Sequence, residues 1–277
     1  MKHFKKLVVP YIIWSAVFVV FPLVLIFLYA VTTGGNSLVN IKFTWESFRK
    51  MAEPIYVSVF LRSLKLGVIT TIICLGLGYP VAYMISKCRE QVQVFLILFV
   101  TIPMWINTLL RTYAWISILQ DNGLLNSFLE LLGIGKLHLM YTDVAVVMGL
   151  VCDLLPFMII PIHTVLTKMD HSLIEAAQDL GADKWQVFGK VIFKMSIPGV
   201  VNGVTMVFLL AISAFVIPKL LGGAQYFLIG NLIEDQFLNV GNWNFGSAIS
   251  IILALAILLI INLMRKVDND GAGGEEE

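Results

Sequence analysis

Two ionisable side chains lie inside long apolar stretches of the sequence, where a charge is costly. Arg111 and Asp153 are the sole Asp, Glu, Lys or Arg residues of the stretches 94–119 and 144–166. A charge at the centre of a bilayer costs about 2.5–3.5 kcal/mol on insertion scales, so it faces the bundle interior and has a partner. At about 1.5 Å per residue, both lie roughly 12–14 Å from the outer ends of their expected helices. The sequence therefore predicts an intramembrane ion pair between Arg111 and Asp153.

Three interpretations of these two charges stay open at the level of sequence. It can be structural and hold two membrane helices together, or Arg111 can extend to the outer membrane interface. Alternatively, Asp153 lines the path of a cationic solute, because Pro156 cannot donate a hydrogen bond to the carbonyl of Cys152 and leaves irregular backbone nearby. Carboxylates and aromatic faces recognise ammonium groups. The further pathway candidates of these types are Trp105, Tyr113, Trp115, Glu234 and Asp235.

Patterns typical of catalysis or metal binding do not occur in the sequence. The four histidines fall on separate segments without metal-ligand spacing, and no Ser/His/Asp grouping shares a segment. The three cysteines suggest neither a disulfide framework nor a metal cluster. There is no Gly-x-x-x-x-Gly-Lys-Ser/Thr phosphate loop, so nucleotide hydrolysis belongs to another polypeptide. An enzyme is the weakest interpretation, and we expect this chain to bind no metal and no cofactor.

The composition is that of an integral membrane protein. Hydrophobic residues make up 58% of the 277 residues and charged residues 13%, with a mean hydropathy of +0.88. The net charge of +1 gives no field to attract nucleic acid. No apolar run alternates at period two, which excludes a β-barrel. About 20 apolar residues of helix cross a bilayer, and six runs of that kind occur: Leu7–Val31, Leu64–Ile85, Val94–Leu119, Val144–Leu166, Ile197–Pro218 and Phe245–Met264.

Six spans place both termini on one side of the membrane. If that side also holds 87–93 and 167–196, it carries eleven Lys and Arg residues, against seven on the side of 33–62 and 219–243. Basic residues concentrate in cytoplasmic loops, so we expect both termini to be cytoplasmic. The first run is too long for a signal peptide and is expected to remain as a span. Residues 1–266 are then one membrane domain, followed by an acidic disordered tail at 267–277.

The expected cytoplasmic loop between the fourth and fifth spans has its own helical pattern. Ser172 and Glu175 have the spacing of a capping box, which predicts a helix start. A helix from there has four small or apolar residues on one face, and Gly181 supplies the left-handed residue that ends it. Asp183 with Gln186 resembles a second helix start. The face is formed by Leu173, Ala176, Ala177 and Leu180.

The same loop resembles a known family. Glu175-Ala176-Ala177, three further residues, Gly181 and then an apolar cluster at 191–193 are similar to the EAA loop of the membrane permeases of binding-protein-dependent ABC importers. Length, layout and the flanking stretches 154–157 and 222–224 are most similar to the spermidine/putrescine permeases among them. One departure is Lys194, where the family commonly has proline; it leaves the end of the second loop helix open.

The resemblance implies a fold, partners and a mechanism. The fold is an all-α integral membrane protein of the type I ABC importer permease architecture, with six transmembrane helices and a coupling helix between the fourth and fifth. Glu175, Ala176, Ala177 and Gly181 would seat a cytoplasmic ATPase, which holds ATP and Mg. The implied partners are a second homologous six-helix permease, two ATPase subunits and an extracytoplasmic substrate-binding protein. Together they would import a polyamine across the bacterial cytoplasmic membrane by alternating access.

Two rival functions stay in view. A permease for another small solute, such as an oxyanion, would expose Arg111 to the pathway. An ion-coupled secondary transporter or a channel is less favoured, because of the short loop helix and because no internal repeats are detectable.

Overall fold

The computed structural model describes residues 10–11, 14–33, 42–133, 135–223 and 226–272. Within these ranges the chain is helical apart from turns, short connections and one isolated bridge between Thr32 and Phe43. The elements in order are η1 Ala16–Val20, α2 Phe21–Ala30, α3 Glu46–Met51, α4 Pro54–Ser86, α5 Glu90–Trp105, α6 Thr108–Leu119, α7 Leu124–Leu131, α8 Asp143–Thr167, α9 His171–Asp179, α10 Lys184–Val187, η2 Phe188–Ile192, α11 Phe193–Ser213, α12 Val216–Leu221, α13 Ile229–Leu238 and α14 Trp243–Ala272.

Four of the described helical segments are long and apolar enough to cross a membrane, and a fifth counts if a bent pair is one span. The four are α4, α8, the continuous segment Lys184–Ser213 and the Trp243–Met264 part of α14. The expected first span is represented by a shorter apolar helix, Ala16–Ala30. Its expected beginning falls partly on residues outside the described ones. The all-α membrane fold is confirmed, whereas the count of six spans stays a prediction.

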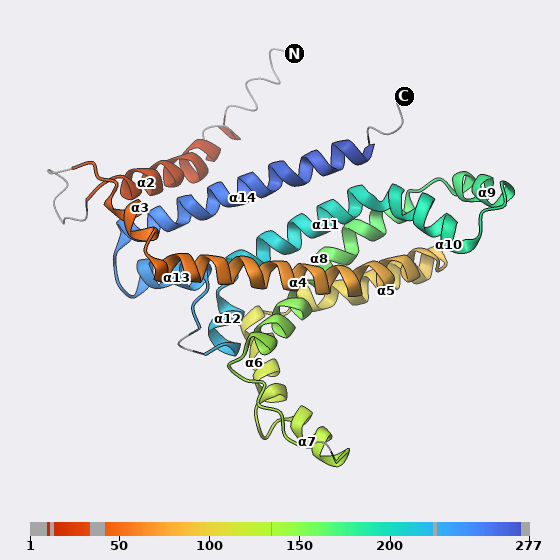
Figure 1. The fold of residues 1–277 in the computed structure, drawn as a ribbon, viewed down its shortest axis with the longest axis horizontal. Helices are drawn as coiled ribbons and strands as arrows, with labels where there is room; N and C mark the ends of the chain where they lie inside the picture. The colour runs from red at the N-terminus through yellow and green to blue at the C-terminus, as the bar shows by residue number, and fades with distance from the viewer. Residues whose placement is uncertain (1–9, 12–13, 34–41, 134, 224–225, 273–277) are drawn as a thin grey trace, which may run out of the picture.

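A close-packed unit of α4, α8 and α11 forms the centre of the molecule (Figure 1). Glycines allow the approach: a Cβ on Gly78 of α4 would lie 2.9 Å from Cγ of Met158 on α8. A Cβ on Gly203 of α11 would lie 2.9 Å from the sulfur of the same Met158. On Gly199 it would lie 2.9 Å from the carbonyl oxygen of Pro161. Small residues that let helix backbones come together are the main packing device of membrane helices.

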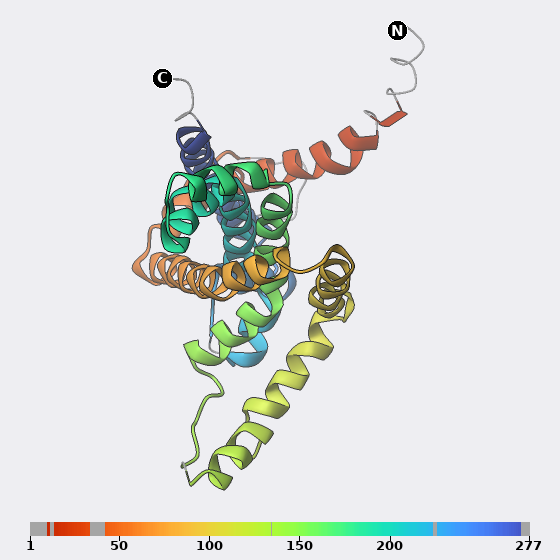
Figure 2. The same cartoon turned by 90° about the vertical axis from the view of Figure 1, so that its right-hand side faces the viewer.

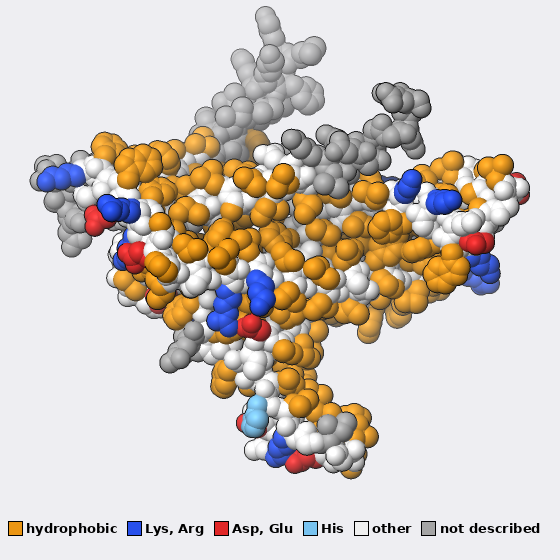
Figure 3. Space-filling view, viewed as in Figure 1, with side chains coloured by type: hydrophobic (Ala, Val, Ile, Leu, Met, Phe, Trp, Pro, Cys, Tyr) orange, Lys and Arg blue, Asp and Glu red, His pale blue; other side chains and the backbone are white. Residues whose placement is uncertain are grey.

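The helices α2 and α14 lie side by side at the edge of this unit (Figure 1). Most of the face drawn in Figure 3 is hydrophobic, and its charged side chains lie at the two ends, on the projecting arm of α6 and α7 and in one group where the arm joins the bundle. An apolar belt with charged ends is what a bilayer requires of the surface that it covers.

The expected third span, Val94–Leu119, is divided into two helices instead of forming one continuous helix. α5 ends at Trp105, and the helical pair on either side of the break is bent by 92°. Pro103 near the end of α5 and the extended backbone of Ile106 stop the first helix. Asn107 then caps α6, with its side chain accepting a hydrogen bond from the backbone N–H of Leu109. The arm of α6 and α7 therefore projects away from the bundle (Figure 2).

The ends of several other predicted segments also differ from those in the structure. α4 begins at Pro54, so residues 54–62 of the expected outer loop are helical. The fifth span begins at Lys184 rather than Ile197 and ends at Ser213, before a break that precedes α12. α14 continues to Ala272, beyond the boundary expected at 267, and residues 273–277 lie outside the described ones. The fourth span agrees with its prediction to within one residue at each end.

Candidate functional site

The loop helix α9 starts at a different residue from the one predicted. Its N-cap is Asp170, whose carboxylate accepts a hydrogen bond of 2.9 Å from the backbone N–H of Ser172. The predicted capping box of Ser172 with Glu175 is therefore wrong, because Asp170 starts the helix earlier and Ser172 already lies in its first turn. An aspartate satisfies the unpaired N–H groups of a helix start at least as well as serine does.

The four residues that the sequence analysis assigned to one face of α9 lie on two different faces. Ile174 and Ala177 are partly buried against the core. Leu173 and Ala176 face outward with Glu175, and the Leu180 side chain at the helix end is 90% exposed. Ala177 therefore seats α9 on the bundle, and the surface left open to a partner is made by Leu173, Ala176 and Leu180.

The turn after α9 agrees with the prediction. Gly181 has φ +83°, the left-handed conformation that favours glycine. The N–H groups of Gly181 and Ala182 donate to the carbonyls of Gln178 and Ala177, the hydrogen-bond pair of a Schellman motif. Asp183 and Gln186 form a reciprocal capping box that starts α10. Trp185, 84% exposed, extends from this second helix, and the sequence analysis did not single it out.

Arg111 and Asp153 form an ion pair between α6 and α8. Their side chains are 16% and 18% exposed. The Arg111 guanidinium also donates a 2.5 Å hydrogen bond to the carbonyl oxygen of Pro103 in the last turn of α5. Arg111 thus joins three segments at the 92° break: the end of α5, the start of α6 and the middle of α8. A cation at a helix C-terminus is favourable because carbonyls without helical partners gather there.

The other pathway candidates differ in their exposure and in their contacts. Trp105, at the end of α5, and Tyr113, on α6, are 83% and 56% exposed. Trp115 packs against the core. The two acidic candidates belong to α13 and have partners within the chain.

Each of the two acids contacts a side chain of a neighbouring segment or turn. Glu234 forms an ion pair of 2.9 Å with Lys219 of α12. Asp235 accepts a 2.8 Å hydrogen bond from the Asn239 amide at the end of α13. The expected outer loop 219–243 thus contains the helix α13, on which both acids lie.

An interaction that the sequence analysis missed joins the start of α4 to the start of α8. Asp143 accepts hydrogen bonds of 2.7 Å from Arg62 and 2.6 Å from the hydroxyl of Tyr226. The Arg62 guanidinium lies 4.0 Å from the centre of the Tyr226 ring. Burial, together with the carboxylate of Asp143, raises the pKa of Tyr226 above its usual range. The three residues are 81 or more positions apart, so no sequence pattern indicates their contact.

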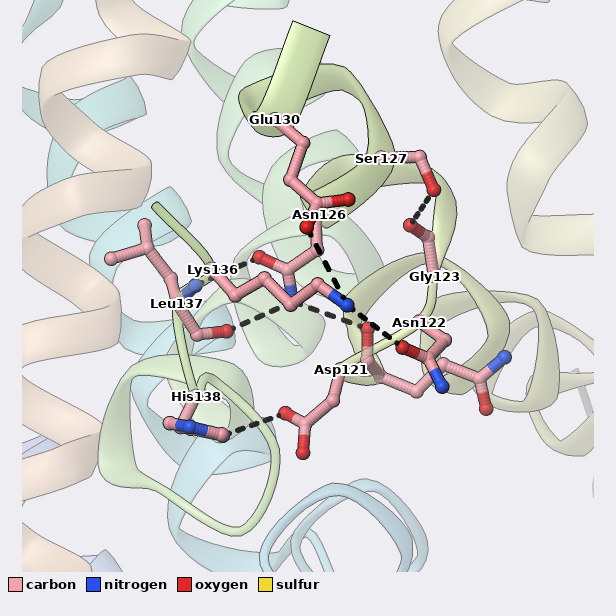
Figure 4. Close-up of polar contacts among 10 residues, drawn as sticks. Asp121, Asn122, Gly123, Asn126, Ser127, Glu130, Lys136, Leu137 and His138 are labelled. Atoms are coloured by element: carbon pink, nitrogen blue, oxygen red, sulfur yellow. Dashed lines mark hydrogen bonds and ion pairs between the residues drawn. The ribbon is translucent and has the colours of Figure 1, made fainter. Parts of the chain in front are cut away.

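Polar side chains also close the tip of the α6–α7 arm (Figure 4). His138 contacts Asp121 at 2.9 Å, and Lys136 donates to Asn122 at 3.1 Å. The buried Asn126 accepts from the backbone N–H of Leu137 at 2.9 Å and donates to its carbonyl at 3.0 Å. These contacts hold 136–138 beside α7. Among the described residues, no group of three His, Cys, Asp or Glu side chains has the arrangement of a metal site.

Comparison with known proteins agrees with this architecture. The chain is 38% identical over 258 residues to the spermidine/putrescine transport system permease protein PotB of Escherichia coli, covering 92% of this chain and 94% of the relative. It is 39% identical over 262 residues to the PotB protein of Haemophilus influenzae, covering 93% and 92% of the two chains.

A solved structure supports the fold independently of sequence identity. A chain of a bacterial alginate ABC transporter, solved in complex with an alginate-bound periplasmic protein, superposes with a TM-score of 0.79 at 16% identity. The match covers 94% of this chain and 92% of the other. Residues 74–269 match the family model described as binding-protein-dependent transport system inner membrane component. The loop of α9 and α10 and the packed unit of α4, α8 and α11 thus belong to a multi-pass membrane permease, and the chain is a member of the binding-protein-dependent transport system inner membrane component family.

Proposed function

We propose that this chain is a permease subunit of an ATP-driven importer of polyamines, with spermidine and putrescine as the substrates. The observation that carries the proposal is the identity of 38–39% over more than nine tenths of both chains to spermidine/putrescine permeases. The chain would supply part of the membrane path, and ATP and Mg would be held by a separate ATPase subunit. Solute would cross by alternating access.

The exposed surface of the α9–α10 loop supports docking of that ATPase. Leu173, Ala176 and Leu180 leave an apolar strip uncovered at one end of the molecule, and Trp185 extends beside it. An exposed apolar patch on a short helix marks a contact with another protein. Glu175 is exposed in the same helix and offers a charge next to the strip. Gly181 sets the angle at which α10 returns to the bundle.

Orientation follows from the same loop. The α9–α10 end of the molecule also holds the connection between α4 and α5 and the C-terminal end of α14 (Figure 1). An ATPase lies in the cytoplasm, so this end is proposed to be cytoplasmic, with both termini on that side. The excess of Lys and Arg on this side supports the same orientation. α13, near the other end, would face a binding protein outside the membrane.

A second permease subunit is proposed to complete the pathway. The outward faces of α5 and α6 carry large apolar side chains that the described part of this chain does not cover, among them Phe95, Phe99, Trp105, Leu110 and Tyr113. One homologous six-helix partner, two ATPase subunits and one extracytoplasmic substrate-binding protein make up the proposed assembly.

Within the pathway, the contacts favour a structural role for Arg111 and Asp153. Arg111 is held by both Asp153 and the Pro103 carbonyl, so its charge is already used inside the chain. An oxyanion permease would need this guanidinium open to solute. The polyamine proposal has no such requirement.

Uptake by the purified assembly tests the proposal. The complex is reconstituted in proteoliposomes with ATP inside and the binding protein outside, and radiolabelled spermidine, putrescine or sulfate is added. Polyamine accumulation that depends on ATP supports the proposal. Accumulation of sulfate without polyamine would replace it with the oxyanion alternative, and uptake without ATP would point to a secondary transporter.

A further inference from the structure

The helix that leaves the coupling loop is irregular at its start. α10 passes into α11 without a break through the π-helical turn η2, Phe188–Ile192. The backbone on either side, at Val187 and Phe193, stays in the right-handed helical region. π-helical turns are rare and occur mostly at functional positions. The contacts that hold this turn on the bundle therefore bear on how the loop acts on the spans.

Two tyrosines of α4 make those contacts. Tyr79 and Tyr83 are one helical turn apart and therefore share a face of α4. The Tyr79 ring meets Phe188 edge to face, with centroids 6.0 Å apart, and lies 5.6 Å from the ring of Phe193. The Tyr83 ring meets Phe188 at 5.3 Å. Aromatic contacts of this kind connect both ends of the π-helical turn to one helix.

A buried hydrogen bond also joins α4 to α11 beside these aromatic contacts. The hydroxyl oxygens of Tyr79 and Ser196 are 2.9 Å apart, and Ser196 is fully buried. The Ser196 hydroxyl donates to the carbonyl of Phe193 at 2.8 Å. A serine hydroxyl has one proton to donate, so Tyr79 is the donor to Ser196. The resulting chain runs from α4 through Ser196 to the residue that ends the π-helical turn.

α4 and α11 are also tied together further into the membrane. The close contacts of Gly78 and Gly203 with Met158 leave no free space between these helices and α8. A close-packed interface of this kind transmits displacement because it cannot deform continuously. The part of the connection that could yield is the π-helical turn.

We propose that Tyr79 and Ser196 are positioning residues that fix this turn to α4, so that a displacement of the α9–α10 loop moves α4 and α11 together. The inference rests on the proposed function, in which an ATPase displaces the loop. Without the hydrogen bond, movement of the loop would be absorbed at Phe188–Ile192 and would reach the spans only in part.

Distances between spin labels test the inference without any solute. Labels are placed at Gln178 on the loop and Met84 on α4, both exposed, in a variant whose three cysteines are replaced by alanine. In the assembled complex the distance between labels is expected to stay the same when the ATPase is trapped with ATP and vanadate. In Tyr79→Phe or Ser196→Ala it is expected to shift or broaden on trapping.

Tyr83→Phe is the matched control. It also removes a hydroxyl from a ring that contacts Phe188, but among the described residues this hydroxyl makes no hydrogen bond. A wild-type distance that changes on trapping, or a Tyr79→Phe variant that behaves like Tyr83→Phe, would overturn the inference. If the ATPase does not bind the complex at all, the inference and the proposed docking are both overturned.

Coupling between hydrolysis and transport gives the second readout. With ATPase binding intact, Tyr79→Phe is expected to reduce polyamine uptake per ATP hydrolysed at least fivefold, whereas Tyr83→Phe keeps the wild-type ratio. An unchanged ratio in Tyr79→Phe counts against the inference. If the wild-type complex imports no polyamine, the proposed substrate is wrong, and the label distances still decide the positioning role.

Discussion

Single polar side chains close the ends of interrupted helices throughout this protein. Arg111 binds the Pro103 carbonyl at the end of α5, and Asn231 donates to the Phe215 carbonyl at 2.7 Å where α12 begins. The buried Ser63 accepts from the backbone N–H of Ile229 at 2.8 Å at the start of α13. Backbone groups freed in an apolar setting need such partners. Breaks in the helices are therefore stabilised residue by residue.

The Arg111–Asp153 pair predicts that a double substitution restores stability lost in each single variant. Arg111→Gln leaves a buried carboxylate unpaired, and removing one partner of a buried pair costs about 3–5 kcal/mol. Asp153→Asn leaves the guanidinium unpaired in the same way. We expect each single variant to express poorly and melt earlier in detergent, and the double variant to recover most of the loss. If Asp153→Asn instead melts normally but imports no polyamine, the carboxylate acts in the pathway.

The Tyr226 contact predicts a smaller effect near the starts of α4 and α8. Tyr226→Phe keeps the ring over Arg62 and removes only the hydrogen bond to Asp143. A hydrogen bond to a charged group contributes about 1.5–3 kcal/mol. We expect a lower melting temperature in detergent, with ATPase binding unchanged. Tyr141→Phe, at an exposed ring nearby, is the control and should melt like the wild type; an equal loss there would show that the Asp143 contact is not responsible.

At the scale of elements, long helices alternate with broken ones. α4 and α8 are continuous, although both contain proline, because their neighbours pack tightly around them. The predicted third span is bent sharply, and the predicted fifth is extended at its N-terminal end by α10 and η2. The bend after α5 directs the arm of α6 and α7 away from the bundle, whereas the break after α11 folds α12 against α8. A similar interruption forms the α9–α10 loop, where a Schellman turn separates two capped helices.

A bulky substitution on α9 is expected to block binding of the ATPase if it lies on the exposed face of the helix. Ala176→Trp adds bulk to the exposed strip, so it is expected to abolish ATPase binding and uptake while the subunit still inserts. Leu238→Trp, at an exposed position on α13, is the control for bulk at the other end of the molecule. Normal ATPase co-purification with Ala176→Trp would contradict docking on this strip. Ala177→Trp is less informative, because Ala177 already packs against the bundle.

The cap of α6 predicts the stability of the bend. Asn107→Ala removes the side-chain oxygen that accepts from Leu109, and losing an N-cap costs about 1 kcal/mol. The expected result is a lower melting temperature in detergent, whereas Asn107→Asp should keep the cap and the wild-type value. A wild-type melting temperature for Asn107→Ala would mean that the Arg111 contacts alone hold the bend.

At the scale of the whole molecule, the chain combines a packed centre with large exposed apolar faces. The packed unit of α4, α8 and α11 gives it a firm centre. The projecting arm and the outward faces of α5 and α14 leave large apolar surfaces uncovered by the described residues. Lipid and a partner permease are proposed to cover them. The charged and polar contacts at each end, on α13 and at the α9–α10 loop, then face the two aqueous sides.

Labelling from outside the cell tests the orientation of the whole chain. In a variant with the three native cysteines replaced, a cysteine at Asn239 is expected to react with an impermeant thiol reagent in intact cells. A cysteine at Lys184 is expected to react only after the membrane is opened. Labelling of position 184 in intact cells would reverse the proposed orientation.

The sequence by itself determined the features that depend on composition and local spacing. Apolar runs predicted an all-α membrane fold, and the fourth span was located within one residue at each end. Gly181 and the Asp183–Gln186 capping box were correct because turn and cap chemistry act within a few residues. The Arg111–Asp153 contact was predictable because two isolated charges in apolar helices need each other.

Only the tertiary structure decided where the helices break and which residues meet over long distances. Pro103 disfavours a continuous helix, but the 92° bend also depends on Asn107 and on Arg111 reaching back to α5. The Arg62–Asp143–Tyr226 and Tyr79–Ser196 contacts join residues that are 81 or more positions apart. The division of α9 into a packed and an exposed face is set by the neighbouring helices. Local sequence fixes helix-forming tendency and end chemistry, whereas contacts between helices depend on how the whole chain packs.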